Sequence, residues 1–138
     1  EGLKVSAESE KSVAPPDKKS ALISELMQIA HDCKHENWDG VGAEAIEPGA
    51  IDTAIAFIRA LPADVPLPEL APEPDGGISL DWIVSKNRLV SLSCSSSSRL
   101  AFAWLDGSDT GQGILGFDGA KVPDDLLFYV RKITASSF

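Results

Sequence analysis

The sequence predicts an α+β domain with two N-terminal helices, an antiparallel meander of three or four strands, and a C-terminal helix. Apolar residues recur with a helical period between residues 22 and 61, whereas they alternate with a period of two between residues 78 and 104. A run of helices followed by a run of strands is typical of a two-layer α+β fold. The length of 138 residues fits one domain. We assign residues 17–138 to it, and we expect residues 1–16, which end in two prolines, to form a flexible arm.

Each helix is predicted from an apolar stripe and a start or stop signal. The first should begin at Asp17 or Ser20, because either residue can cap a helix N-terminus. The second should begin at Pro48 and end before Pro62, since proline is tolerated only in the first turn. The last should begin at Pro123. The inward positions are Leu22, Leu26, Ile29, Ala30 and Cys33 in the first helix, Ile51, Ala54, Ile55, Ile58 and Leu61 in the second, and Leu126, Leu127, Val130 and Ile133 in the last.

The strands follow a proline-rich crossing. Five prolines between residues 62 and 74 predict an extended, polyproline-like connection without regular structure. Alternating apolar residues then predict strands over 78–85, 88–94 and 100–104. A strand over 112–117 is a weaker prediction, because glycine is frequent there and disfavours strands. One face of this meander must be covered, and the helical stripes can cover it.

Charge is distributed unevenly along the chain. The net charge is −9, and residues 36–81 hold ten acidic residues against a single basic one, Arg59. The rest of the chain is neutral. This balance excludes a nucleic-acid backbone or an anionic membrane surface as the main partner, because both would repel the protein. No stretch reaches the roughly 20 apolar residues that a transmembrane helix needs, and we expect a cytoplasmic protein.

Two segments carry a resemblance. Residues 38–43 read W-D-G-V-G-A, and residues 74–82 read P-D-G-G-I-S-L-D-W. Together with the proline-rich stretch between them, they resemble a family of small uncharacterised bacterial proteins with W-D-G-x-G-A and P-D-G-x-I-x-L-x-W motifs. The resemblance covers roughly residues 36–133. It implies a bacterial, cytosolic origin, and it implies no activity and no catalytic residues.

The same two motifs supply the candidate binding residues Trp38, Asp39, Asp75, Asp81 and Trp82. Aromatic walls and carboxylate acceptors could form a small-ligand site or the site of a hydrolase-type enzyme if these side chains converge. The alternative is structural: the tryptophans pack, and each Asp-Gly pair makes a turn. Because Asp-Gly occurs four times in the chain, the sequence favours the turn interpretation.

No other pattern predicts chemistry. His31 and His35 lie one helical turn apart, and we interpret them as solvated side chains of the helix, with no metal. The serines at 95–98 lack a nucleophile-elbow context, so we predict no catalytic residue and no cofactor. Cys33 and Cys94 fit two buried thiols, with a bridge between them as the alternative.

The sequence therefore favours a protein that is not an enzyme. We expect a non-catalytic, acidic, protein-binding domain of a bacterial accessory system, of the antitoxin, immunity or inhibitor kind, whose partner has a basic surface. The alternative is the small-ligand binder or hydrolase-type enzyme described above. A domain of a longer chain, joined through residues 1–16, is a third interpretation.

Overall fold

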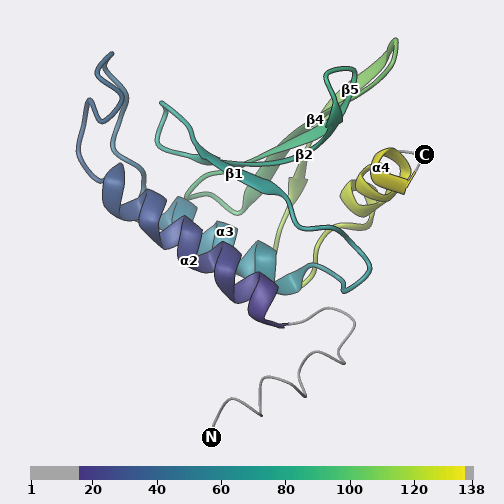
Figure 1. Cartoon of the computed structure of the whole chain (residues 1–138), viewed down its shortest axis with the longest axis horizontal. Coiled ribbons are helices and arrows are strands. Elements are labelled where there is room, and N and C mark those ends of the chain that lie inside the picture. The colour runs from purple at the N-terminus through teal and green to yellow at the C-terminus, as the bar shows by residue number, and fades with distance from the viewer. Residues whose placement is uncertain (1–15, 136–138) are drawn as a thin grey trace, which may run out of the picture.

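A computed structural model of the chain describes residues 16–135, which form three helices and one five-stranded sheet (Figure 1). Two helices precede the sheet and one follows it. The helices are α2 (Pro16–Asp32), α3 (Pro48–Ala60) and α4 (Asp124–Ala135), and the strands are β1 (Glu69–Pro72), β2 (Ile78–Ser85), β3 (Arg88–Cys94), β4 (Arg99–Asp106) and β5 (Asp109–Gly116).

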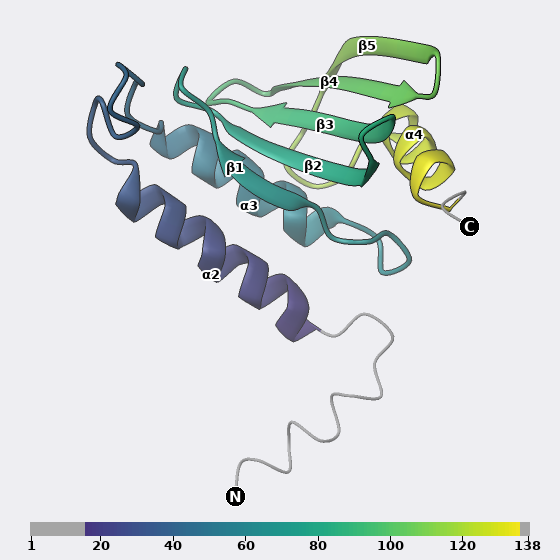
Figure 2. The ribbon, with the colours of Figure 1, turned by 45° about the horizontal axis from the view of Figure 1, so that its top comes forward.

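The sheet is an antiparallel meander in which each strand pairs with the next one in the sequence. Helix α3 packs on β2 and β3, and α4 packs on β2, β3 and β4, so both cover the same face of the sheet (Figure 2). Helix α2 forms an outer layer, because it packs against α3 and reaches the sheet only at β1. None of the helices within residues 16–135 packs on the opposite face of the sheet.

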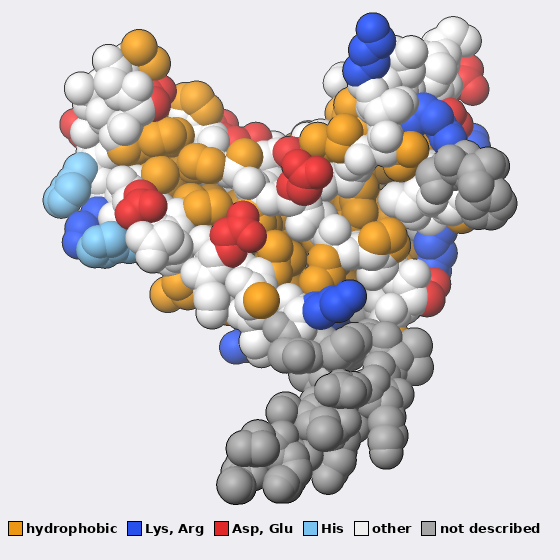
Figure 3. All heavy atoms as spheres, in the orientation of Figure 1, with side chains coloured by type: hydrophobic (Ala, Val, Ile, Leu, Met, Phe, Trp, Pro, Cys, Tyr) orange, Lys and Arg blue, Asp and Glu red, His pale blue; other side chains and the backbone are white. Residues whose placement is uncertain are grey.

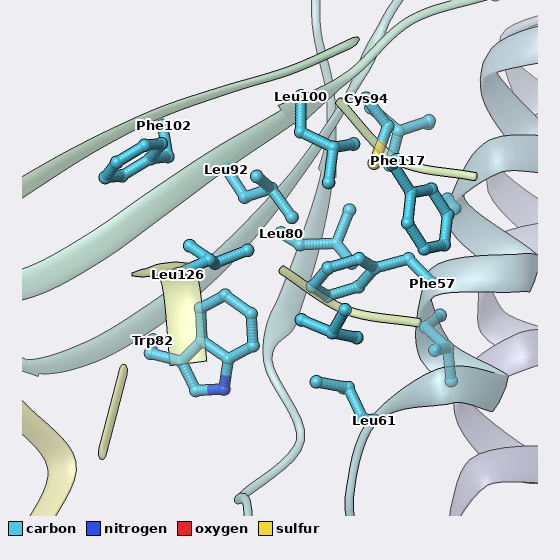
Figure 4. Packing of buried hydrophobic residues seen from close by; sticks show 14 of the residues in the cluster. Phe57, Leu61, Leu80, Trp82, Leu92, Cys94, Leu100, Phe102, Phe117 and Leu126 are labelled. Atoms are coloured by element: carbon cyan, nitrogen blue, oxygen red, sulfur yellow. The ribbon is translucent and has the colours of Figure 1, made fainter. Parts of the chain in front are cut away.

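The core lies between the sheet and the helices (Figure 4). Phe57 of α3 is fully buried, and its ring makes edge contacts with Trp82 at 6.2 Å and with Phe117 at 5.8 Å between centroids. Cross-strand neighbours Leu80, Leu92 and Phe102 point from successive strands into the same core. All three helices and the central strands contribute to one apolar cluster, which drives their association.

The α+β class and the antiparallel meander are confirmed, but the number of strands is larger than predicted. The additional strand is β1, which lies inside the proline-rich crossing where no regular structure was expected. It can pair because it is short and at the edge of the sheet, where proline is tolerated. Strand β5 also begins earlier than predicted, at Asp109.

Two smaller expectations can be compared with the structure. The first helix begins at Pro16, one residue inside the segment that was assigned to the arm, and the remainder of that arm (residues 1–15) lies outside the described residues. Cys33 and Cys94 are both free and buried, as expected. Burial raises the pKa of the Cys94 thiol to about 12, and the charge of Glu73 adds to this rise.

Candidate functional site

The structure does not bring the five candidate side chains together. Trp82 and Asp81 are neighbours in β2, so they point to opposite faces of the sheet. Trp82 faces the helices, is 3% exposed, and donates its indole N–H to the carbonyl of Pro66 at 2.7 Å. Asp81 faces the other side and accepts hydrogen bonds from the hydroxyls of Ser79 (2.7 Å) and Ser91 (2.6 Å). These two residues therefore cannot line one pocket.

Trp38 and Asp39 organise the loop between α2 and α3. The Trp38 indole N–H donates to the carbonyl of Glu44 at 2.7 Å. One carboxylate oxygen of Asp39 accepts the backbone N–H groups of Val41 (2.9 Å) and Ala43 (3.0 Å). These backbone hydrogen bonds favour the ionised form, so they hold the pKa of Asp39 below its ordinary value. Both residues of this motif are thus engaged in a turn.

Asp75 holds a second turn, and this turn is joined to the first loop. Its carboxylate accepts the backbone N–H of Gly77 at 3.1 Å. The N–H of Glu44 donates to the carbonyl of Pro74 at 2.8 Å, and the N–H of Glu47 donates to that of Gly76 at 2.9 Å. The segment that directly follows the first motif is therefore bonded to the second motif through the backbone, and this contact forms a structural joint between the helical layer and the sheet.

Gly76 shows why this joint needs glycine. Its φ is +96°, a conformation that other residues rarely adopt. A side chain there would also meet the carbonyl oxygen of Ala45 at 3.2 Å. The interpretation of the Asp-Gly pairs as turns agrees with this geometry at both motifs.

The face of the sheet opposite α3 and α4 has no covering element among residues 16–135, and we call it the open face. Figure 3 shows the molecule hollowed above it, between the loop at 33–47 on the upper left and the strand hairpins on the upper right. Most of its side chains are small or polar. Three cross-strand rows form it: Ala71, Ser79, Ser93, Ala101 and Ile114; Glu69, Asp81, Ser91, Ala103 and Gln112; and Ile83, Leu89, Leu105 and Thr110.

Carboxylates gather at the end of the open face nearest β1. Glu47, Glu73 and Asp75 line a shallow hollow of about 390 Å³. Its lining also includes one cation, Arg99, and Ser93, Ala101 and Ile114 of the first row. Glu69 and Asp81 are register partners in the adjacent row. These residues, Glu47, Glu69, Glu73, Asp75 and Asp81, are the open-face carboxylates. All of them come from the acidic segment 36–81, and they make up half of its acidic residues.

Glu73 is the residue that sequence reasoning missed. It lies just after β1, and its carboxylate accepts the hydroxyl of Ser93 at 2.9 Å. Burial raises the pKa of this carboxyl, and the nearby charges of Asp75 and Asp81 raise it further, while the Ser93 hydrogen bond opposes the rise. A cation placed over the open face would stabilise the ionised form of Glu73, because its charge would offset the cost of burial and the repulsion by Asp75 and Asp81.

The serine loop at 95–98 shows no nucleophilic arrangement. The Ser95 hydroxyl accepts the N–H of Ser97 at 3.2 Å, and the Ser97 hydroxyl accepts the N–H of Arg99 at 3.1 Å. These are local turn contacts. Ser96 lies against Gly49 of α3, where an added Cβ would be 2.8 Å from the Cβ of Ser96. The loop thus packs on the start of α3.

Within residues 16–135, no three or more His, Cys, Asp or Glu side chains are grouped as a metal site would require. None of the described helices is long and apolar enough to cross a membrane. No protein-family model, no curated protein sequence and no solved structure matches the chain. The family resemblance of the two motifs therefore stays a prediction.

Proposed function

We propose that this protein is a non-catalytic, protein-binding domain that uses the open face of its sheet to hold an extended, basic segment of a partner protein. The observation that carries the proposal is the one-sided cover of the sheet. In the part of the chain that the structure describes, helices pack on one face only, and the other face presents small side chains beside a group of carboxylates.

The small side chains support an extended ligand. Ser91, Ser93, Ala101 and Ala103 occupy the middle of the open face, so a chain can lie close to the sheet there. Apolar side chains flank this strip, with Ile83 half exposed on β2 and Ile114 more exposed on β5. A partner segment would bury apolar area on these residues and direct its cationic side chains toward the carboxylates.

Electrostatics support a basic partner. Half of the acidic residues of segment 36–81 lie on or beside the open face, and a positive surface would be steered toward them. The acidic residues Asp39 and Asp64 have other contacts, since Asp39 holds its own turn and Asp64 makes a bidentate ion pair with Arg131. These two carboxylates are engaged in contacts of their own and are not among the open-face carboxylates.

This binding role fits a bacterial accessory protein in the cytoplasm, of the antitoxin, immunity or inhibitor kind. In such a role a small acidic domain can cover a positively charged part of another protein. Nothing in the role requires a catalytic group, a metal or a cofactor.

The experiment is a selection of displayed peptides on the immobilised protein, followed by amide chemical-shift mapping with the selected segments. Basic segments should be enriched, and their shifts should map to residues 79–81, 91–93 and 101–103. Raising the ionic strength from about 0.1 M to about 1 M shortens the Debye length from about 10 Å to about 3 Å, so binding should weaken.

A pair of double variants tests the charge directly. Glu73→Gln with Asp81→Asn removes two charges from the open face, and Glu25→Gln with Asp52→Asn removes two charges from exposed positions on α2 and α3. We expect the first pair to weaken binding by about tenfold or more, equivalent to about 1.4 kcal/mol, and the second to change it little. Equal effects of both pairs, or binding that ignores salt, would contradict the proposal.

A further inference from the structure

The two edges of the sheet are protected very differently. Strand β1 has four residues, ends in Pro72, follows Pro68, and is contacted by α2. Strand β5 has eight residues, contains no proline, lysine or arginine, and contacts only β4 among the described helices and strands. Proteins usually shield an edge strand with charge, proline, a bulge or a covering element, because its free backbone groups can pair with another chain. Edge β1 has such shields, whereas edge β5 has, within residues 16–135, only the charge of Asp109 at its first residue.

The backbone of β5 is regular enough to accept another strand. Its pairing with β4 runs from Asp109 to Gly116 without a register shift. The N–H of Gly107 points toward β3 and donates to the carbonyl of Asn87. The N–H and C=O of the preceding residue, Asp106, therefore point toward β5, where they form hydrogen bonds with Asp109. Because this pattern alternates, the N–H and C=O groups of every second residue of β5 point away from the sheet. These residues are Thr110, Gln112, Ile114 and Gly116.

Glycines keep the covered side of β5 flat. The rings of Trp104 and Phe102 lean across from β4 over Gly111 and Gly113, and an added Cβ would lie 2.6 Å and 2.9 Å from them. The rings take the place of side chains that β5 lacks, an arrangement that stabilises glycine at sheet edges. The strand therefore holds its extended shape without a further element on that side.

We propose that β5 pairs antiparallel with β5 of a second copy of this chain, centred on Gly113, so that the two sheets become continuous. Thr110 then faces Gly116 of the second copy, and Gln112 faces Ile114. Each opposed pair exchanges two N–H···O bonds. Opposed residues belong to the same face of the sheet, so the two open faces lie on the same side.

The distribution of charge along the chain favours a second copy of this chain over another partner. The acidic excess lies in segment 36–81, at the β1 end of the sheet, whereas residues 82–138 hold five acidic and six basic residues. Two copies that meet at β5 therefore bring their near-neutral ends together and keep their acidic ends apart. The pairing also places no like charges opposite each other between residues 110 and 116. This inference does not depend on the proposed function.

The test is the mass in solution, by light scattering and sedimentation over a range of concentrations. The mass measured for the wild type should rise with concentration from 14.6 kDa toward twice that value. Gln112→Pro removes an N–H that points away from β4, so the β4–β5 ladder is kept and the variant should be monomeric. Gln112→Ala keeps the N–H and should dimerise as the wild type does.

A second pair of variants guards against a folding defect. Ile114→Lys places a charge on the proposed seam, and Ile83→Lys places the same charge on the open face of β2, away from the edge; the wild-type side chains are 62% and 51% exposed. We expect only Ile114→Lys to weaken the dimer. The proposal would be overturned if the wild type stayed monomeric at every concentration, even if its β5 edge then paired with another protein. Equal dimerisation of Gln112→Pro and Gln112→Ala would also overturn it.

Discussion

The two faces of this sheet come from the same strands and differ in almost every property. On the covered face, successive strands present large apolar side chains such as Leu80, Leu92 and Phe102, which the helices bury. On the open face, the same strands present Asp81, Ser91 and Ala103, which point away from α3 and α4. The difference shows that only the covered face forms part of the hydrophobic core. Substitutions should therefore change stability on the covered face and binding on the open face.

The largest effect is expected where β2 contributes to the core. Leu80→Ala removes a fully buried side chain, and we expect it to lower the free energy of unfolding by about 2–5 kcal/mol. Ile83→Ala truncates a half-exposed side chain of the same strand on the open face and should cost less than about 1 kcal/mol. Urea unfolding of both variants measures the contrast. Similar losses would mean that the open face is also a core.

A smaller effect is expected where the covered face reaches the edge of the sheet. In Gly111→Ala the new Cβ would lie 2.6 Å from the Trp104 ring, and the ring must move out of its stack on Tyr129, which has a centroid distance of 4.8 Å. We expect a loss of about 1–3 kcal/mol from this overpacking and a change in near-ultraviolet circular dichroism. Gly116→Ala, with no atom near its Cβ, is the control and should change neither measurement.

On the open face, pH should affect stability in an unusual direction. The pKa of Glu73 is raised above its ordinary value of 4.5, so the folded protein binds this proton more tightly than the unfolded chain does. The resulting stabilisation is present below pH 4.5 and is lost as pH rises through the raised pKa. Glu73→Gln, which keeps an acceptor for Ser93, should therefore be modestly more stable than the wild type at neutral pH and similar to it in acid.

Unfolding curves at several pH values measure this difference, with Glu25→Gln on α2 as the control for net charge. A neutral-pH loss of stability in Glu73→Gln would show that the carboxylate is needed for folding. That result would remove the distinction between the two faces at this position.

The smallest effect is expected for the alkylation of Cys94 by a thiol reagent in the folded protein. Cys94 points into the covered face, is fully buried, and has its pKa raised to about 12, so almost no thiolate forms at pH 8. Alkylation should be negligible in buffer and rapid in denaturant, as followed by mass spectrometry. Rapid labelling of Cys94 in buffer would show that the covered face opens locally near this position.

Much of the fold could be predicted because it depends on local patterns. The apolar period of two marks β2, β3 and β4, and prolines at 48 and 62 bracket α3. Strand β1 could not be predicted, because four residues beside prolines show no alternation and the strand forms only by pairing with β2 across the turn at residues 73–77. The full extent of β5 was hidden by glycines whose missing side chains are replaced by the rings of Trp104 and Phe102.

The candidate site was predictable only in part. Asp39 and Asp75 act in turns, which the glycine after each of them indicates. The alternation of β2 also places Trp82 and Asp81 on opposite faces, so the sequence contained the reason why they do not share a pocket. Glu73 carried no signal, because its role depends on Ser93, which lies twenty residues away in the sequence.

By itself, the sequence determined the fold class, the two sides of each central strand, and an acidic segment between residues 36 and 81, because periodicity and charge are local properties of a chain. Only the tertiary structure decided which carboxylates share a surface and which edge of the sheet is left uncovered. The first depends on how strands and turns are placed in space, and the second depends on where the helices pack, which joins segments far apart in the sequence.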